Sequence, residues 1–135
     1  MSRAERLRQR VVAATEDPDA FYELLAPDIV WDISDSDSPM AGVYHGREAV
    51  RDWWRRWVGA FSDWSSEIEQ VFEKGDKVVF FAHEHGHGRT SGAWAEMKRA
   101  NVWTFRGDQV VHFKSFRDQG AALREAGIDP PRIDP

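Results

Sequence analysis

Three histidines at alternate positions, His83, His85 and His87, are the residues of this chain with the most evident capacity for chemistry. In a β-strand this spacing places all three imidazoles on one face, about 7 Å apart. Two histidines at positions i and i+2 can hold a zinc ion, but three along one strand seldom converge on one ion without ligands from other segments. We therefore predict no metal site and favour histidines that face solvent or an interface. An acid–base or pH-sensitive role is the alternative.

Glu84 stands between these histidines, so it points to the opposite face of the same strand, together with Phe80 and Ala82. If that face lines a concave cavity, burial raises the pKa of the carboxyl group and the carboxylate can serve as a general base. If the face is convex, Glu84 is a surface charge. Val79 and Phe81 make the other face apolar as well, so both interpretations stay open.

The segment that follows has the pattern of a β-hairpin. Apolar and polar residues alternate on both sides of residues 106–109, where glycine tolerates a positive φ. Arg99 and Asn101 on the first arm, and Ser115 and Arg117 on the second, fall on the apolar side. Isolated polar groups on an apolar concave face are typical of a ligand pocket. The apolar residues that share this predicted face are Trp103, Phe105, Val111 and Phe113.

The composition limits the remaining function classes. The 135 residues suffice for one domain, which we place at residues 1–128, followed by a mobile tail at 129–135. The chain has no cysteine, which excludes thiol chemistry, and its net charge of −5 argues against a nucleic-acid partner. No apolar run resembles a membrane span or a secretory signal, so we expect no membrane partner and a cytoplasmic location. With 7 Trp and 8 Phe, either a thick core or a roomy aromatic cavity is expected.

The order of elements predicts an α+β fold with segregated helices and strands. Asp17 and Pro18 mark the start of a short second helix, which Pro27 is expected to end. Three tryptophans within five residues predict that the helix at 47–61 packs a bulky apolar face against a sheet. The full expected order is helices at 2–15 and from 17, a strand at 29–33, a loop at 34–39, the helix at 47–61, strands at 67–72, 78–88, 97–105 and 110–117, and a helix at 119–126.

Several short segments, in this order, carry a family resemblance. They are residues 25–32 (LAPDIVWD), 38–50 (SPMAGVYHGREAV), 106–111 (RGDQVV) and 116–119 (FRDQ). With these segments the chain resembles the SnoaL-like (polyketide cyclase-like) branch of the nuclear transport factor 2-like superfamily. The resemblance implies a cone-shaped, curved, mostly antiparallel sheet wrapped around the N-terminal helices, with a pocket on the concave side and commonly a homodimer across the convex side. It implies no metal and no single activity, because the superfamily includes isomerases, hydrolases, cyclases, dehydratases and proteins without catalysis.

The resemblance also shows which catalytic sets are incomplete. Aligned without gaps to ketosteroid-isomerase-like members, the chain has Ile33 where they carry the carboxylate base and Asn101 where they carry an aspartate donor. Aligned to epoxide-hydrolase-like members, it has Ser115 in place of a carboxylate, while Glu84 falls near their earlier aspartate. Asp32 follows the first-strand pattern, but alternation turns it away from the base position. Neither chemistry is therefore expected to be inherited unchanged.

We predict a SnoaL-like domain that binds a small hydrophobic ligand in an aromatic pocket, with isomerisation, cyclisation or dehydration of a carbonyl compound by proton transfer as its reaction. No cofactor is expected. Glu84 or Asp32 would be the base, and Asn101 with Arg99 would stabilise a developing enolate. The alternative is a non-catalytic ligand-binding or dimerisation module of the same fold, and the sequence leaves catalysis open. The further ligand-binding candidates are Ser115, Arg117, Trp103, Phe113, Trp31, Tyr44 and Trp57.

Overall fold

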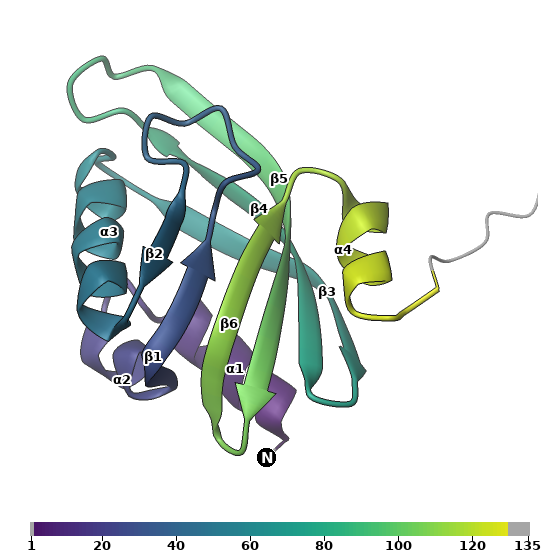
Figure 1. The fold of residues 1–135 in the computed structure, drawn as a ribbon. Helices are drawn as coiled ribbons and strands as arrows, with labels where there is room; N and C mark the ends of the chain where they lie inside the picture. The colour runs from purple at the N-terminus through teal and green to yellow at the C-terminus, as the bar shows by residue number, and fades with distance from the viewer. Residues whose placement is uncertain (1, 130–135) are drawn as a thin grey trace, which may run out of the picture.

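A six-stranded sheet forms the framework of residues 2–129, the part of the chain that this computed structural model describes (Figure 1). The strands lie in the order β2-β1-β6-β5-β4-β3, and neighbours are antiparallel except for the parallel pair of β1 and β6. The predicted α+β class with a curved, mostly antiparallel sheet is confirmed. The predicted tail at 129–135 lies, after its first residue, outside the described residues. The strands are β1 (Leu25–Asp32), β2 (Val43–His45), β3 (Ser65–Lys74), β4 (Lys77–His87), β5 (Trp94–Arg106) and β6 (Gln109–Phe116).

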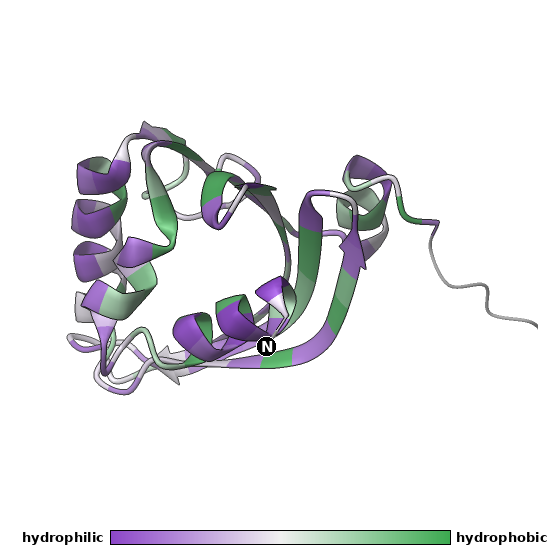
Figure 2. Ribbon diagram, turned by 90° about the horizontal axis from the view of Figure 1, so that it is seen from below, coloured by the Kyte–Doolittle hydropathy of each residue, from purple (hydrophilic) through white to green (hydrophobic). Residues whose placement is uncertain are grey.

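The helices divide unequally between the two sides of the sheet. Helices α1 (Arg3–Val12), α2 (Pro18–Glu23) and α3 (Arg47–Gly59) lie on the concave side, whereas α4 (Gln119–Glu125) lies on the convex side (Figures 1 and 2). In Figure 2 the sheet curves around α1, and α4 stands outside that curve. None of the described helices combines the length and the apolar character that crossing a membrane requires.

Side-chain caps fix where three of these helices begin. Ser2, Asp17 and Asp118 each accept a hydrogen bond from the backbone N–H three residues further on. Such caps satisfy N–H groups that the first helical turn leaves unpaired. The predicted start of α2 at Asp17 and Pro18 is thereby confirmed.

Several elements differ from the sequence-based expectation. Pro27 does not end α2 but lies inside β1, whose pairing with β6 is irregular between Leu25 and Val30. A proline is tolerated there because that stretch of β1 does not need every N–H for the ladder. The short strand β2 was not predicted, because three residues are too few to show an alternating pattern. Helix α3 ends at Gly59, and Phe61 instead bridges to Gly88.

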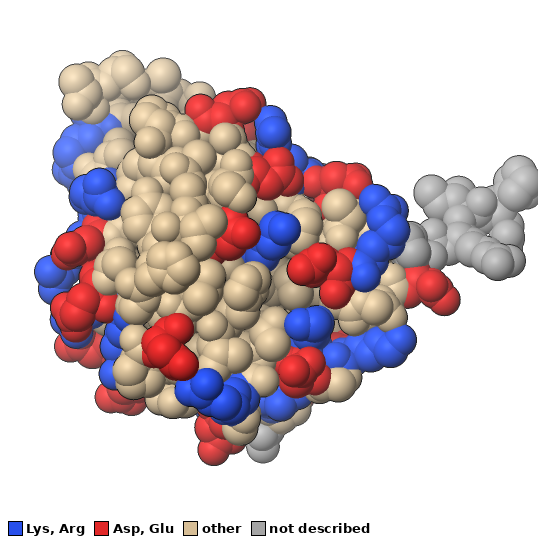
Figure 3. All heavy atoms as spheres, viewed as in Figure 1, with Lys and Arg blue, Asp and Glu red and all other residues tan. Residues whose placement is uncertain are grey.

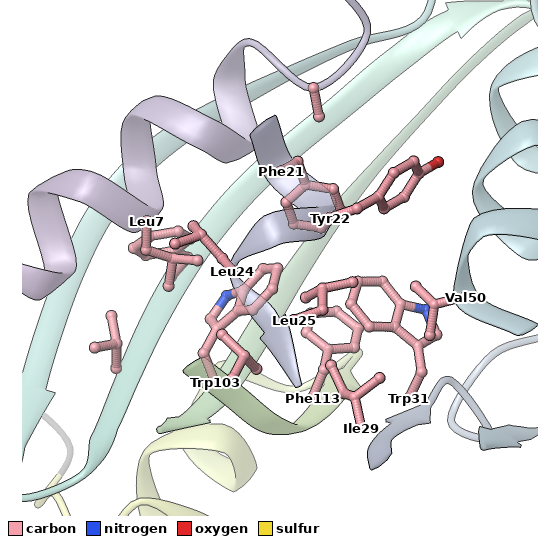
Figure 4. Packing of buried hydrophobic residues seen from close by; sticks show 14 of the residues in the cluster. Leu7, Phe21, Tyr22, Leu24, Leu25, Ile29, Trp31, Val50, Trp103 and Phe113 are labelled. Carbon is pink, nitrogen blue, oxygen red and sulfur yellow. The ribbon is translucent and has the colours of Figure 1, made fainter. Parts of the chain in front are cut away.

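The two faces of the sheet bury two separate apolar clusters. The concave face packs Trp31, Trp103 and Phe113 against side chains of α1, α2 and α3 (Figure 4). The Trp31 and Phe113 rings stack with centroids 3.8 Å apart and planes at 17°. On the convex face, Val79 and Phe81 pack with α4. Since both faces of β4 are covered, alternation along β4 could not show which face is concave.

A β-bulge changes the hairpin face that alternation predicts. The register of β5 and β6 shifts between Thr104 and Phe105, so Phe105 pairs with Val110 while Trp103 pairs with Phe113. Val110 is consequently fully buried in the concave cluster, and Val111 is only half-buried. The prediction that Val111 shares the apolar face was wrong, because the extra residue in the bulge reverses the alternation.

Candidate functional site

The concave face and the helices enclose a main cavity of about 280 Å³. A volume of this size suits a small organic ligand. Helix α1 contributes Val11 and Val12 to its wall, and the first residues of β3 contribute Ser65 and Ser66. The remaining wall residues are mostly aromatic. They are Ala14, Thr15, Glu16, Phe21, Trp31, Trp53, Trp54, Trp57, Trp64, Glu84, Asn101, Trp103 and Phe113.

A second space of about 60 Å³, here called the side chamber, adjoins the main cavity. Glu84 and Asn101 belong to both walls, together with Trp53, Trp57 and Phe113, so these residues stand at the junction of the two spaces. The side chamber is otherwise lined by Ile33, Ser36, Ser38, Met97, Arg99 and Ser115.

The strand register settles the orientation of Glu84. Glu84 pairs with Met97 across β4 and β5, and Ala82 pairs with Arg99, so all four side chains belong to the concave face. Neither a hydrogen bond nor an ion pair joins the Glu84 carboxylate to another described residue, although Arg99 is its diagonal neighbour. Burial raises the pKa of Glu84 to about 7, against the smaller, opposing effect of the Arg99 charge. A carboxyl group in this state exchanges protons readily at neutral pH.

Arg99 is buried, with 8% of its surface exposed, and is held by two hydrogen bonds. Its Nε donates to the Ser115 hydroxyl at 2.9 Å and its Nη2 to the backbone carbonyl of Asp35 at 2.7 Å. The Nη1 group makes no hydrogen bond within the described residues. Burial lowers the pKa of Arg99, but a guanidinium starts so far above neutral pH that it stays charged. The side chamber therefore contains a fixed positive charge.

Asn101 leaves a buried polar atom without a partner. The side chain is 7% exposed, and its Oδ1 atom has no hydrogen-bond partner among the described residues. Buried polar groups in native proteins are nearly always paired, so an unpaired one at a cavity wall points to a bound molecule as its partner. Asn101 pairs with Phe80 and Ser115 across the neighbouring strands, which places it in the middle of the concave face.

Arg117 does not line either space, contrary to the prediction from alternation. Strand β6 ends at Phe116, so the alternation no longer determines the direction of Arg117. Its side chain is 55% exposed and holds the loop after β1: Nε donates to Asp35 at 2.8 Å, and Nη1 donates to Asp37 at 3.1 Å. The Arg117 backbone N–H also donates to Asp35, and these bonds lower the pKa of that carboxyl group. Arg117 thus fixes the loop that supplies two serines to the side chamber.

Asp32 and Tyr44, also predicted at the site, are absent from the walls of both described spaces. Asp32 pairs with Lys114 on the other face of β1, where its carboxylate accepts hydrogen bonds from Ser34. Burial raises the pKa of Asp32, but the hydrogen bonds from Ser34 outweigh it and the net pKa is lowered. Tyr44 donates its hydroxyl to the Met40 carbonyl and packs against the concave cluster.

The three alternate histidines lie on the convex face, and each contacts a carboxylate. The nearest nitrogen–oxygen distances are 3.1 Å from His83 to Glu96, 3.3 Å from His85 to Glu67, and 2.7 Å from His87 to Asp63. Within residues 2–129, no three side chains of the types that bind metals are grouped to hold an ion. Trp94, with 52% of its surface exposed, stacks on His85. This arrangement is a surface feature, separated from the cavity by the sheet.

The structure therefore brings together most of the predicted site residues. Trp31 and Trp103 line the main cavity, and Arg99 and Ser115 line the side chamber. The predicted residues that line both spaces are Trp57, Glu84, Asn101 and Phe113. Sequence reasoning did not single out the other wall residues. The tryptophans among them could have been noticed from the aromatic content, but the loop serines have no pattern that marks them. Examples are Trp53, Trp64, Met97, Ser36 and Ser38.

Comparison with known proteins agrees with this architecture. The family model described as the SnoaL-like domain matches residues 4–113. The chain belongs to the SnoaL-like domain family. The resemblance inferred from its sequence segments is thus confirmed. No curated protein matches the chain significantly.

Several solved structures share the fold over nearly the whole chain. A nuclear transport factor 2-like protein from Burkholderia thailandensis is 25% identical, with a TM-score of 0.75 and coverage of 97% of this chain and 99% of that one. A protein with a ketosteroid-isomerase-like fold from Catenulispora acidiphila, solved with trimethylamine, is 20% identical, with a TM-score of 0.72 and coverages of 96% and 97%. TerC, co-crystallised with polyporic acid, is 17% identical, with a TM-score of 0.72 and coverages of 93% and 98%.

Proposed function

We propose that this SnoaL-like protein binds a small hydrophobic carbonyl compound in its main cavity and moves a proton on it. The observation that carries the proposal is Glu84, a carboxylate without a hydrogen bond or ion pair, placed at the cavity wall with a pKa of about 7. A general base is most effective when its pKa lies near the working pH. The aromatic walls would bind the apolar body of the ligand.

The reaction step uses only groups of this chain and the substrate. Glu84 takes a proton from the carbon next to the carbonyl: the C–H bond breaks, an O–H bond forms on Glu84, and the electron pair moves onto the carbonyl oxygen. The amide N–H groups of Asn101 would stabilise the resulting enolate, with the Arg99 charge nearby. Return of the proton from Glu84 to the same or another carbon completes an exchange or an isomerisation.

Two neighbours support small-molecule binding by this fold. The Catenulispora acidiphila protein was solved with trimethylamine, and TerC with polyporic acid. Both ligands are small organic molecules, and the cavity of this chain has room for a compound of that class.

The alternative is a binding module without catalysis. Ile33 favours it, because this residue lines the side chamber at the position where ketosteroid-isomerase-like members are expected to carry their base. Ser115 adds to this view, since it occupies the wall without being able to act as a base unaided. Under this alternative, ligands bind but their protons do not exchange.

Solvent-deuterium exchange separates the two functions. We would incubate 2-tetralone, a hydrophobic aromatic ketone, with the protein in D₂O near neutral pH and follow the protons next to the carbonyl by NMR. We expect the wild type to accelerate exchange and Glu84→Gln to reduce the acceleration by about 10²-fold or more. Asp32→Asn tests the other predicted base and should retain the activity, because Asp32 lies on the outer face. Binding without accelerated exchange would support the binding module instead.

We also propose that the protein forms a homodimer through the convex face of the sheet. The exposed Trp94 and the imidazole–carboxylate pairs beside it offer aromatic and polar contact groups on that face. Light scattering of the wild type and Trp94→Glu would test this: a dimer that dissociates in the variant supports it, and a monomeric wild type contradicts it. A cytoplasmic location stays a prediction from the sequence.

A further inference from the structure

Polar side chains in the wall of the side chamber point to a particular class of ligand. Three of its wall residues are serines whose oxygen already accepts a hydrogen bond. Ser36 accepts from the Ser38 N–H, Ser38 from the Met40 N–H, and Ser115 from Arg99 Nε. None of the three hydroxyl protons has an acceptor within the described residues. Each serine can therefore donate its proton into the chamber.

Arg99 adds a buried positive charge to these donors. No carboxylate of the described chain forms an ion pair with it, because the Asp35 side chain is engaged by Arg117 and only the Asp35 carbonyl oxygen contacts Arg99. The Nη1 group has no hydrogen-bond partner among residues 2–129. A buried guanidinium with unused donors is well suited to bind a carboxylate, since both groups are planar and can form two parallel hydrogen bonds.

The geometry points to an aromatic or polycyclic carboxylic acid as the ligand class. We propose that its carboxylate occupies the side chamber, bound by Arg99 and the serine hydroxyls, while its flat apolar body lies among the tryptophans of the main cavity. This inference rests on the proposed function, because it describes the ligand of the same site. It gives Arg99 a second task, which is to hold the ligand so that the reacting carbon lies at the junction between Glu84 and Asn101.

The charged and titratable groups around the chamber agree with an anion at this place. On β5, Arg99 supplies a positive charge. On β4, Glu84 would oppose the anion only when ionised. From the loop after β1, Asp35 is neutralised by Arg117. At the far wall of the main cavity, Glu16 of the α1–α2 connection is exposed and is not among the wall residues of the chamber. The balance within the chamber is therefore positive once Glu84 is protonated.

A matched pair of probes tests the inference directly. 2-Naphthoate and 2-naphthamide have the same apolar body and differ in whether the polar end is charged. We would measure their binding by calorimetry at about pH 6, below the pKa of Glu84, with tryptophan fluorescence as a second readout. We expect the wild type to prefer 2-naphthoate by about tenfold or more.

Variants show whether Arg99 and the serines cause this preference. Arg99→Gln should remove the preference for 2-naphthoate, and retained binding of 2-naphthamide shows that the cavity is intact. Because Arg99→Gln loses hydrogen bonds and could disturb folding, Ser36→Ala with Ser38→Ala offers a second route. It should weaken binding of 2-naphthoate severalfold and binding of 2-naphthamide less, because a hydrogen bond to a charged carboxylate is stronger than one to a neutral amide. Glu84→Gln should keep the preference, although we expect it to slow the exchange of 2-tetralone protons.

The outcomes of the two experiments can be told apart. A carboxylate preference that depends on Arg99, found in a protein that does not exchange 2-tetralone protons, supports this inference and contradicts the proposed catalysis. Proton exchange without a carboxylate preference supports the proposed catalysis and contradicts this inference. Four results would overturn the inference. They are equal binding of both probes, stronger binding of 2-naphthamide, a preference for 2-naphthoate that survives Arg99→Gln, and no measurable binding of either probe.

Discussion

Glu84 and Arg99 lie diagonally opposite each other on the concave face of β4 and β5, yet no ion pair joins them. Arg99 is directed to Ser115 and to the loop after β1, and Glu84 is left at the junction of the two spaces. A direct ion pair would stabilise the ionised form of Glu84 and lower its pKa. Its absence leaves burial as the dominant influence, so Glu84 titrates near neutral pH.

The first prediction concerns stability as a function of pH. The folded pKa of Glu84 lies near 7, above its ordinary value of 4.5, so the folded state binds the proton more tightly than the unfolded state. The stability that protonated Glu84 contributes to the folded state is fully present below about pH 4.5 and is lost as pH rises through 7. Glu84→Gln should therefore gain stability relative to the wild type between about pH 5 and pH 8, by up to about 3 kcal/mol.

Denaturant unfolding of both proteins across this pH range measures the difference. Asp32→Asn, on the outer face of the sheet, is the matched control for Glu84→Gln. The pKa of Asp32 is lowered, so its contribution changes only in acid and should stay constant above about pH 5. If the difference in the free energy of unfolding between the wild type and Glu84→Gln does not change with pH, Glu84 does not have the raised pKa that the structure assigns to it.

The second prediction concerns the pH dependence of proton exchange. If Glu84 is the base, only its ionised form is active, so the rate should rise with pH and level off above the pKa of about 7. Initial rates of 2-tetralone exchange, corrected for the rate without protein, give the profile. A rate that is flat or falls between about pH 6 and pH 8 would exclude Glu84 as the base.

Much of the fold could be predicted from the sequence, because long amphipathic elements carry clear patterns. The order of strands β3 to β6 and the hairpin between β5 and β6 follow from alternation and from the glycine turn. The bulge at Val111, opposite Thr104 and Phe105, could not be predicted, since an extra residue leaves no mark in composition. Strand β2 is too short for its pattern to be visible.

The site was predictable only in part, for related reasons. Asn101 and Ser115 were found because they are polar residues on an apolar face. The direction of Glu84 stayed open because α4 covers the convex side of β4 and makes both faces apolar. Arg117 was assigned to the pocket by extending alternation one residue beyond the end of β6, where the chain had already turned.

The third prediction concerns the loop that Arg117 holds. Arg117→Ala removes the side-chain bonds to Asp35 and Asp37, so the loop should open more often. The amide protons of Ser38 and Met40, which are bonded within the loop, should exchange with solvent severalfold faster in a hydrogen-exchange experiment.

A matched variant distinguishes this from a general loss of stability. Arg106→Ala breaks a comparable exposed pair with Asp28, at a distance of 3.1 Å, on the other end of the sheet. It should leave exchange at Ser38 and Met40 unchanged. If both variants accelerate exchange in the loop equally, Arg117 has no special role in holding it.

The fourth prediction concerns the aromatic wall of the cavity. Phe113→Ala removes the ring that stacks on Trp31 and should destabilise the protein by about 3 kcal/mol. Phe72→Ala, at a partly buried ring of the convex cluster, is the comparison and should cost less. Thermal or denaturant unfolding measures both, and an equal loss would mean that the Trp31–Phe113 stack is not a principal part of the core.

The most direct test of the account is the titration of Glu84 itself. Carboxyl carbon resonances of protein labelled with ¹³C-glutamate, compared between the wild type and Glu84→Gln, identify the Glu84 signal and give its pKa by NMR. The structure predicts a midpoint near 7. A midpoint near the ordinary value of 4.5 would show that the cavity holds a permanently ionised carboxylate, and would contradict its role as a proton carrier at neutral pH.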